Sequence, residues 1–390
     1  MTMKWAAHAS TGWGRLRRWS IGLLLCLALV AVSGCRSFGF YRQAIQGQYQ
    51  IIARQEKFDK LLSDPQTPAR LKARLRLVQD LRAFAQDQLK LPVDGHYQRY
   101  ADVHRPFVVW NVEAAPEFSM EPKSWWYPFV GSLDYRGYFS ESAATNYARA
   151  LRKQGFDVYV GGVAAYSTLN WFKDPVLNTF IFEPESDLAE TIFHELGHQR
   201  VFAHGDTDFN EAFATTVGQE GARRWLRAQG ATNACSQYLA ELRRTDQFVH
   251  LVAGTRQRLA ALYGDQPLDG GSFQATRKRP GIPVEQLQRD KQAILRRLQE
   301  DYSKLKAEHW AGDAQYDQWF AQGVNNAKLN SVAAYYDLVP GFQRLLELNG
   351  GDLPRFYQAA SQLAKRPKTE RDRHLGTLSA QTQKLATATN

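Results

Sequence analysis

Cysteine is scarce in this chain, with three residues among 390. Cys26 and Cys35 stand close to the N-terminus, so only Cys235 belongs to the body of the chain. A fold held together by disulfide bonds is therefore excluded, and so is a structural zinc site built from several thiolates. We expect the lone Cys235 to be a small, buried, hydrophobic residue.

The chain also lacks internal repeats and clustered charge. Its 49 Lys and Arg residues exceed its 39 Asp and Glu residues, which gives a net charge of +10. Four of the basic residues lie within residues 1–34, where no acidic residue occurs, so without that segment the charge falls from +10 to +6. The other basic residues are spread along the chain and form no stripe, which indicates a solvated surface and no nucleic-acid partner.

Long apolar runs are missing except for Ile21 to Val32, which is too short to span a bilayer comfortably. Basic residues precede this run, at Lys4, Arg15, Arg17 and Arg18, and the sequence Val32-Ser33-Gly34-Cys35 closes it. This N-terminus resembles a bacterial lipoprotein signal, which implies that residues 1–34 are removed and that Cys35 carries the lipid. The residue after Cys35 is Arg36 and not aspartate, which resembles the pattern that sorts lipoproteins to the outer membrane. We therefore expect a lipid-anchored protein of the bacterial cell envelope, at the outer membrane and facing the periplasm; an ordinary cleaved signal and an anchor helix are the alternatives.

The most informative motif is His194-Glu195-Leu196-Gly197-His198. Positions four apart share one face of a helix, so His194 and His198 can offer two neutral nitrogen ligands to one Zn²⁺. Glu195 lies one position round the helix, where it can act as a general base on water without ligating the metal. A catalytic zinc usually has three protein ligands, and Glu211, at the head of a second predicted helix, is the best candidate for the third.

The alternative to a metal site is a solvated helix face that carries two surface histidines. Apolar residues argue against it, because Leu188, Ile192 and Phe193 give this helix a surface to bury. A charged Glu195 on a buried helix costs free energy unless it has a use. The motif therefore favours a zinc site.

The spacing of apolar residues predicts a mostly helical α+β fold, in which a small mixed sheet packs against a zincin-type pair of metal-binding helices. We expect residues 35–365 to form a single domain. It would comprise a helical section (40–91), a sheet section (105–183), the metal helices (186–230) and a second helical section (231–365). The polar residues 366–390 are predicted to be a disordered tail.

Several stretches resemble the bacterial predicted-aminopeptidase lipoprotein family, a group with a gluzincin-like HExxH motif: Phe107–Asn111, Tyr135–Phe139, Val163–Thr168, Asp174-Pro175, Phe193–Gln199, Gly205–Glu211, Asn325–Leu329 and Val339-Pro340. The resemblance covers most of the chain after residue 35. It implies a zinc-dependent peptidase, expected to be an aminopeptidase, with Zn²⁺ as cofactor and peptides as substrates. It makes His194, His198 and Glu211 the metal ligands and Glu195 the base.

The spacing of the ligands departs from aminopeptidase-N-like gluzincins. Only twelve residues separate His198 from Glu211. A tight turn at residues 204–207 must therefore fold the second helix back onto the first. We interpret His204 as a residue of this turn, although it could instead be a ligand.

A second departure concerns the free amine of a substrate. The relatives hold this amine with a glutamate ahead of the metal helix, but the comparable segment here, Gly161–Tyr166, has no acidic residue. Glu113, Glu117 and Asp134 are candidate amine anchors, with ordinary surface carboxylates as the alternative. The segment Val163–Thr168 is the candidate edge strand that would pair with an extended peptide.

Other roles follow from the chemistry of peptide hydrolysis. Tyr335 is the first candidate to stabilise the oxyanion and Tyr166 the second, with packed aromatic residues as the alternative. Asp187 and Asp208 are candidate acceptors for the second N–H groups of the ligand histidines. An endopeptidase on the same scaffold, or a non-catalytic envelope lipoprotein that binds peptides or cell-wall fragments, are alternative functions.

Overall fold

The structure, a computed structural model, describes residues 39–388 apart from residues 128–130, 169–171, 270 and 277–280. The predicted signal peptide and Cys35 lie outside the described residues. Residues 39–50, which are helical, belong to one compact unit, and the chain from Ile51 onward forms a second. In the described part of the chain, no helix combines the length and apolar character needed to cross a bilayer.

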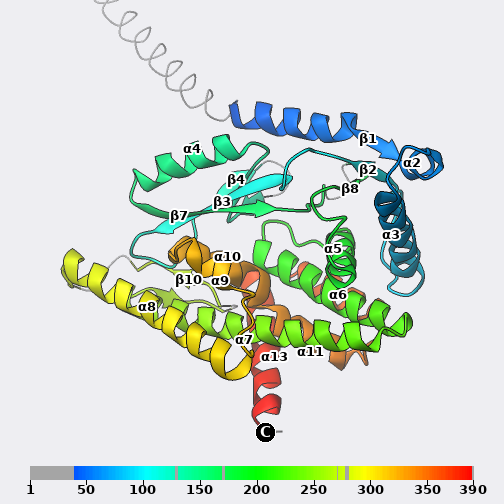
Figure 1. Cartoon of the computed structure of the whole chain (residues 1–390). Coiled ribbons are helices and arrows are strands. Elements are labelled where there is room, and N and C mark those ends of the chain that lie inside the picture. The colour runs from blue at the N-terminus through cyan, green and yellow to red at the C-terminus, as the bar shows by residue number, and fades with distance from the viewer. Residues whose placement is uncertain (1–38, 128–130, 169–171, 270, 277–280, 389–390) are drawn as a thin grey trace, which may run out of the picture. The chain divides into compact units, whose positions relative to one another are not determined.

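The second unit has the mostly helical α+β fold that the sequence predicts (Figure 1). Its strands are β1 (Gln55–Lys57), β2 (Arg99–Ala101), β3 (Val109–Pro116), β4 (Trp125–Tyr127), β5 (Gly131–Leu133), β6 (Arg136–Tyr138), β7 (Phe156–Val163), β8 (Val176–Leu177), β9 (Gln266–Pro267) and β10 (Phe273–Gln274). Its helices are α2 (Phe58–Ser63), α3 (Ala69–Asp87), α4 (Glu141–Arg152), α5 (Glu185–His198), α6 (Thr207–Ala228), α7 (Thr232–Tyr263), α8 (Val284–His309), α9 (Asp317–Ala321), α10 (Asn326–Tyr336), α11 (Val339–Leu348), α12 (Leu353–Ala364) and α13 (Lys368–Ala388).

The sheet section contains a three-stranded antiparallel sheet with β3 in its centre, between β6 and β7. Asn111 of β3 lies opposite Gly137 of β6 and Gly161 of β7. Helix α4 packs on one side of this sheet and α10 on the other (Figure 1). A separate small sheet, in the order β1-β2-β8, pairs β2 with β8 in parallel and with β1 in antiparallel orientation.

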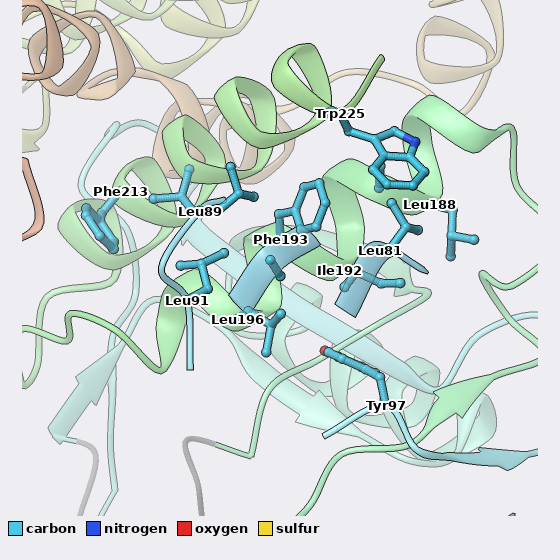
Figure 2. Packing of buried hydrophobic residues seen from close by; sticks show 14 of the residues in the cluster. Leu81, Leu89, Leu91, Tyr97, Leu188, Ile192, Phe193, Leu196, Phe213 and Trp225 are labelled. Atoms are coloured by element: carbon cyan, nitrogen blue, oxygen red, sulfur yellow. The ribbon is translucent and has the colours of Figure 1, made fainter. Parts of the chain in front are cut away.

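The main hydrophobic core lies between α3, α5 and α6. Figure 2 shows Ile192, Phe193 and Leu196 of α5 gathered with Leu81 of α3 and with Leu89. All five side chains are almost completely buried. Burial of a large aliphatic or aromatic side chain contributes about 1.5–3 kcal/mol. One face of α5 is therefore fixed in this core, as its apolar spacing predicts, and the opposite face is left for polar groups.

The C-terminal helix α13 corrects a prediction, because residues 366–390 were expected to be a disordered tail. Instead α13 packs against α11, with Leu375 and Leu378 buried. The helices cross closely at Gly341, where a Cβ atom would lie 2.5 Å from the carbonyl oxygen of Leu375. The prediction is wrong because a few leucines in a polar stretch are a weak local signal, and because the partners of Leu375 and Leu378 are distant in sequence.

Candidate metal centre

Helix α5 carries the two histidines on the side that faces away from the main core. Its first turn holds Glu185 and Asp187, whose negative charges suit the helix N-terminus. His194 and His198 are four positions apart, and their rings lie 4.8 Å apart between centroids. The two histidines therefore lie on one face of the helix, as their spacing predicts.

Two glycines allow α6 to approach α5 closely. A Cβ atom at Gly218 would lie 2.8 Å from the carbonyl oxygen of Glu190 and 3.1 Å from the Cβ of His194. At Gly197 it would lie 3.3 Å from the Cα of Ala214. Real Cβ atoms do not approach to 2.8 Å, so the observed separation of the two helices requires glycine at position 218, and the contact at Gly197 would be tight. The close approach brings Glu211 of α6 alongside the histidines.

Hydrogen bonds and an ion pair hold the turn between the two helices. Asn210 donates to the carbonyl oxygen of Ala203 at 2.8 Å, and its own side-chain oxygen accepts from the Ala203 amide at 2.7 Å. Asp206 caps α6 by accepting from the Phe209 amide, and its carboxylate is paired with Arg371 of α13 at 2.8 Å. Gly205 adopts a φ of 72°, which favours glycine. The tight turn expected at residues 204–207 is therefore present.

Three donor atoms converge where the helices meet. The Nε2 atoms of His194 and His198 are 3.2 Å apart, and a carboxylate oxygen of Glu211 lies 3.4 Å from the first and 3.6 Å from the second. Tetrahedral zinc with ligand distances of about 2.0–2.2 Å places neighbouring ligand atoms about 3.3–3.6 Å apart. The spacing and the donor types therefore fit one zinc ion. Within the described residues, these three side chains form the group of His, Cys and carboxylate residues whose donor atoms are close enough together to hold a metal ion.

The charges at the site are mutually compensating. Burial alone would raise the pKa of Glu211, but the adjacent imidazoles of His198 and His194 outweigh it and lower that pKa below its usual range. Burial raises the pKa of Glu195 to about 8. Glu195 is 7% exposed, and its Oε2 atom has no hydrogen-bond partner among the described residues. A buried carboxylate oxygen without a partner is costly, which indicates a group kept for a ligand or a reacting atom.

The donor atoms open into a cleft of about 710 Å³, which we call the metal cleft. The three side chains that carry the donor atoms, His194, His198 and Glu211, line this cleft, and we call them the metal cluster. Glu195, Tyr166 and Tyr335 line it as well. Strand β7 ends at Val163, so the edge strand expected over Val163–Thr168 is wrong beyond its first residue. Ala164 lines the cleft without strand pairing, and its carbonyl oxygen accepts from Thr179.

A protein-family model described as "Putative aminopeptidase" matches residues 39–375. The chain belongs to this aminopeptidase family. No curated protein and no solved structure matches the chain. The matched region contains both helices of the metal cluster and the sheet beside them, and the family suggests a peptidase function.

Not all candidate residues of this aminopeptidase-family chain reach the cluster. Glu113 and Asp134 line a smaller cavity beside the metal cleft, whereas Glu117 contacts Gln288 of α8 at 3.4 Å and is not among the described residues that line either space. His204 lies in the turn, close to Gly131, and is outside the cluster of three donors.

The expected partners of the ligand histidines are not observed. Asp187 accepts from the Ser186 hydroxyl, and Asp208 is paired with Lys368 at 3.6 Å. The Nδ1 atom of His198 has no hydrogen-bond partner in the part of the chain that the structure describes. The aspartates therefore do not serve as the acceptors that the sequence suggested.

Tyr135 is a site residue that sequence reasoning missed. It lies between β5 and β6 and lines the metal cleft beside Tyr335. Burial raises its pKa, and the charge of Glu211 adds to the effect. For Tyr335 the charge of Glu211 is the main cause of the raised pKa, and burial is the second. Both hydroxyls therefore keep their protons near the metal cluster. The only sequence signal for Tyr135 was its place in a stretch that resembles the family.

Proposed function

We propose that the protein is a zinc-dependent peptidase, and within that class an aminopeptidase, of the bacterial cell envelope. One observation carries the proposal: His194, His198 and Glu211 place three donor atoms 3.2–3.6 Å apart in the cleft that Glu195 also lines. Membership of the aminopeptidase family supports the peptidase class.

The residues have separate roles in this proposal. His194, His198 and Glu211 hold Zn²⁺, which when bound polarises a peptide carbonyl and lowers the pKa of water to about 7. Glu195 accepts the proton of the attacking water and passes it to the leaving amine. Its unpartnered Oε2 supports this role, since no neighbour among the described residues competes for that atom. The Tyr335 hydroxyl donates a hydrogen bond to the developing oxyanion, with Tyr166 as the second candidate in the same cleft.

The composition of the site supports catalysis over a purely structural zinc. Structural zinc sites are closed by four protein ligands, often cysteines. The group found in the described residues has three members and no cysteine, and the only described cysteine, Cys235, is buried and outside the group. The location in the envelope, with a lipid at Cys35, rests on the sequence of the N-terminus.

Metal analysis and kinetics of two variants test the proposal. The purified protein should bind zinc stoichiometrically, as measured by mass spectrometry of its metal content. Glu195→Gln should keep the zinc and lower kcat by about 100- to 10,000-fold, since it removes the general base. Glu211→Ala should lose zinc while it folds.

Glu220→Ala is the matched control on the same helix, because the Glu220 carboxylate is paired with Arg223 and Arg224 instead of the metal cluster. Wild-type turnover by Glu195→Gln, or full zinc content in Glu211→Ala, would contradict the assignment. A panel of peptides with free and acetylated N-termini separates aminopeptidase from endopeptidase activity.

A further inference from the structure

A second cavity adjoins the metal cleft. It measures about 240 Å³, and we call it the acidic chamber because Glu113 of β3, Asp134 between β5 and β6, and Asp208 of α6 line it. The chamber shares Tyr135, Thr207 and Tyr335 with the metal cleft, so the two spaces have a common wall. A group that enters the chamber therefore stands beside the proposed reaction centre.

The chamber has more negative than positive side chains. Six carboxyl groups and two cationic side chains are among its lining residues. Asp337 is neutralised by Arg256 at 2.6 Å, and Asp206 by Arg371 at 2.8 Å.

Three carboxyl groups of the chamber are left with little compensation. Asp208 is 3.6 Å from Lys368, which also pairs with Asp206 at 3.0 Å. Asp134 accepts from the Ser124 hydroxyl, and the carboxyl group of Glu113 has no hydrogen bond or ion pair among the described residues. Carboxylates gathered in a partly buried space favour a cation from outside the chain.

An independent feature also indicates a ligand. Thr207 is 7% exposed, and its hydroxyl oxygen has no hydrogen-bond partner in the described part of the chain, although it lines the chamber. Buried hydroxyls are normally hydrogen-bonded, so this one lacks a partner that a bound molecule can supply. In addition, burial raises the pKa of Glu113, Asp134 and Asp208, because their charges are poorly compensated.

We infer that the acidic chamber binds the positively charged group of the substrate residue whose carbonyl is attacked, with Glu113 as its main carboxylate. The inference rests on the proposed peptidase function and names its substrate class. Asp208 and Thr207 precede Glu211 by three and four positions, so they lie about one helical turn from that ligand, or about 5–6 Å between Cβ atoms. This distance is within the reach of a single amino-acid residue.

The cation can be the α-ammonium group of a free N-terminus or the side chain of Lys or Arg. Four matched compounds distinguish these sources. L-norleucinamide carries the α-ammonium alone, N-acetyl-L-lysinamide carries the side-chain ammonium alone, L-lysinamide carries both, and N-acetyl-L-norleucinamide carries neither. The corresponding anilides serve as substrates.

The experiment combines kinetics of the zinc-loaded protein with calorimetric binding of the amides to the metal-free protein. The wild type should cleave and bind the cationic compounds in preference to the neutral one. Glu113→Gln should reduce that preference by about 10- to 100-fold, the loss expected for a charge-assisted hydrogen bond, without changing the values for the neutral compound. Asp134→Asn provides a second variant if Glu113→Gln does not fold, and Glu117→Gln is the control outside the chamber.

The results separate the two proposals. Equal loss on neutral and cationic substrates in Glu113→Gln, or no preference in the wild type, would overturn the chamber assignment and leave the peptidase proposal intact. If no compound is turned over, the peptidase proposal fails, and the binding data still decide about the chamber. Binding that does not depend on charge or on Glu113 would refute it.

Discussion

Replacement of Gly218 by alanine tests whether close helix packing builds the metal cluster. The new methyl group would lie 2.8 Å from the carbonyl oxygen of Glu190 and 3.1 Å from the Cβ of His194. A carbon atom needs about 3.3 Å from a carbonyl oxygen. Helix α6 must therefore move by about 0.5 Å relative to α5, because neither contact is the flexible end of a side chain.

The size of the effect follows from two opposing contributions. Overpacking a tight core costs about 1–3 kcal/mol, and the higher helix propensity of alanine returns about 1 kcal/mol. We therefore expect Gly218→Ala to lower the free energy of unfolding by about 1–2 kcal/mol. Zinc sites tolerate ligand displacements of about 0.2 Å, so the shift should also weaken zinc binding at least about tenfold.

Chemical denaturation and zinc competition with a chelator measure these two quantities. Gly254→Ala in α7 is the matched control, because a Cβ atom there meets its nearest neighbour, Arg258, only at 3.9 Å. This variant should be stabilised by about 0.5–1 kcal/mol and should bind zinc normally. The packing argument would be refuted if Gly218→Ala matched the wild type in both measurements, or if the control lost as much zinc affinity.

Three further predictions concern stability. Leu375→Ala should lower the free energy of unfolding by about 2–5 kcal/mol in urea titrations, whereas the exposed Leu348→Ala should change it little. Asp206→Asn should cost about 3–5 kcal/mol, because it leaves the buried Arg371 of α13 without its carboxylate partner, and a change below about 1 kcal/mol would contradict this. Burial, with the charge of Asp187, raises the pKa of Glu183 to about 7, so the folded state holds this proton more tightly than the unfolded state. The contribution of Glu183 is therefore greatest below about pH 4.5 and falls as the pH rises through 7. Glu183→Gln should gain stability relative to the wild type between pH 5 and 8, and a parallel pH profile would exclude this.

The sequence predicts the parts of the molecule that depend on local spacing. His194 and His198 share a face because four residues make about one helical turn. The helical character of residues 231–365, which include α7 and α8, was likewise indicated by the spacing of apolar residues. Glu211 was identified from its motif, and the structure brings its carboxylate to the histidines.

The features that the sequence could not reveal depend on contacts between distant residues. Tyr135 and Tyr335 meet at one wall although two hundred residues separate them. Glu113 and Asp208, which are also far apart in the sequence, line one chamber. The helix α13 is polar on average, so only its partners in α11 and its ion pairs with Asp206 explain its order. Local propensity contains no information about such encounters.

The attachment of α13 to the turn at Asp206 has a consequence for synthesis. A ribosome releases the chain from its N-terminus, so helices α5 and α6 emerge well before Lys368 and Arg371. Until those two side chains have been synthesised, the carboxylate of Asp206, which caps α6, has no basic partner on α13. The turn at Asp206 is therefore completed only after α13 has been translated, and a truncation before Lys368 should harm a candidate metal centre that lies more than 150 residues earlier in the chain.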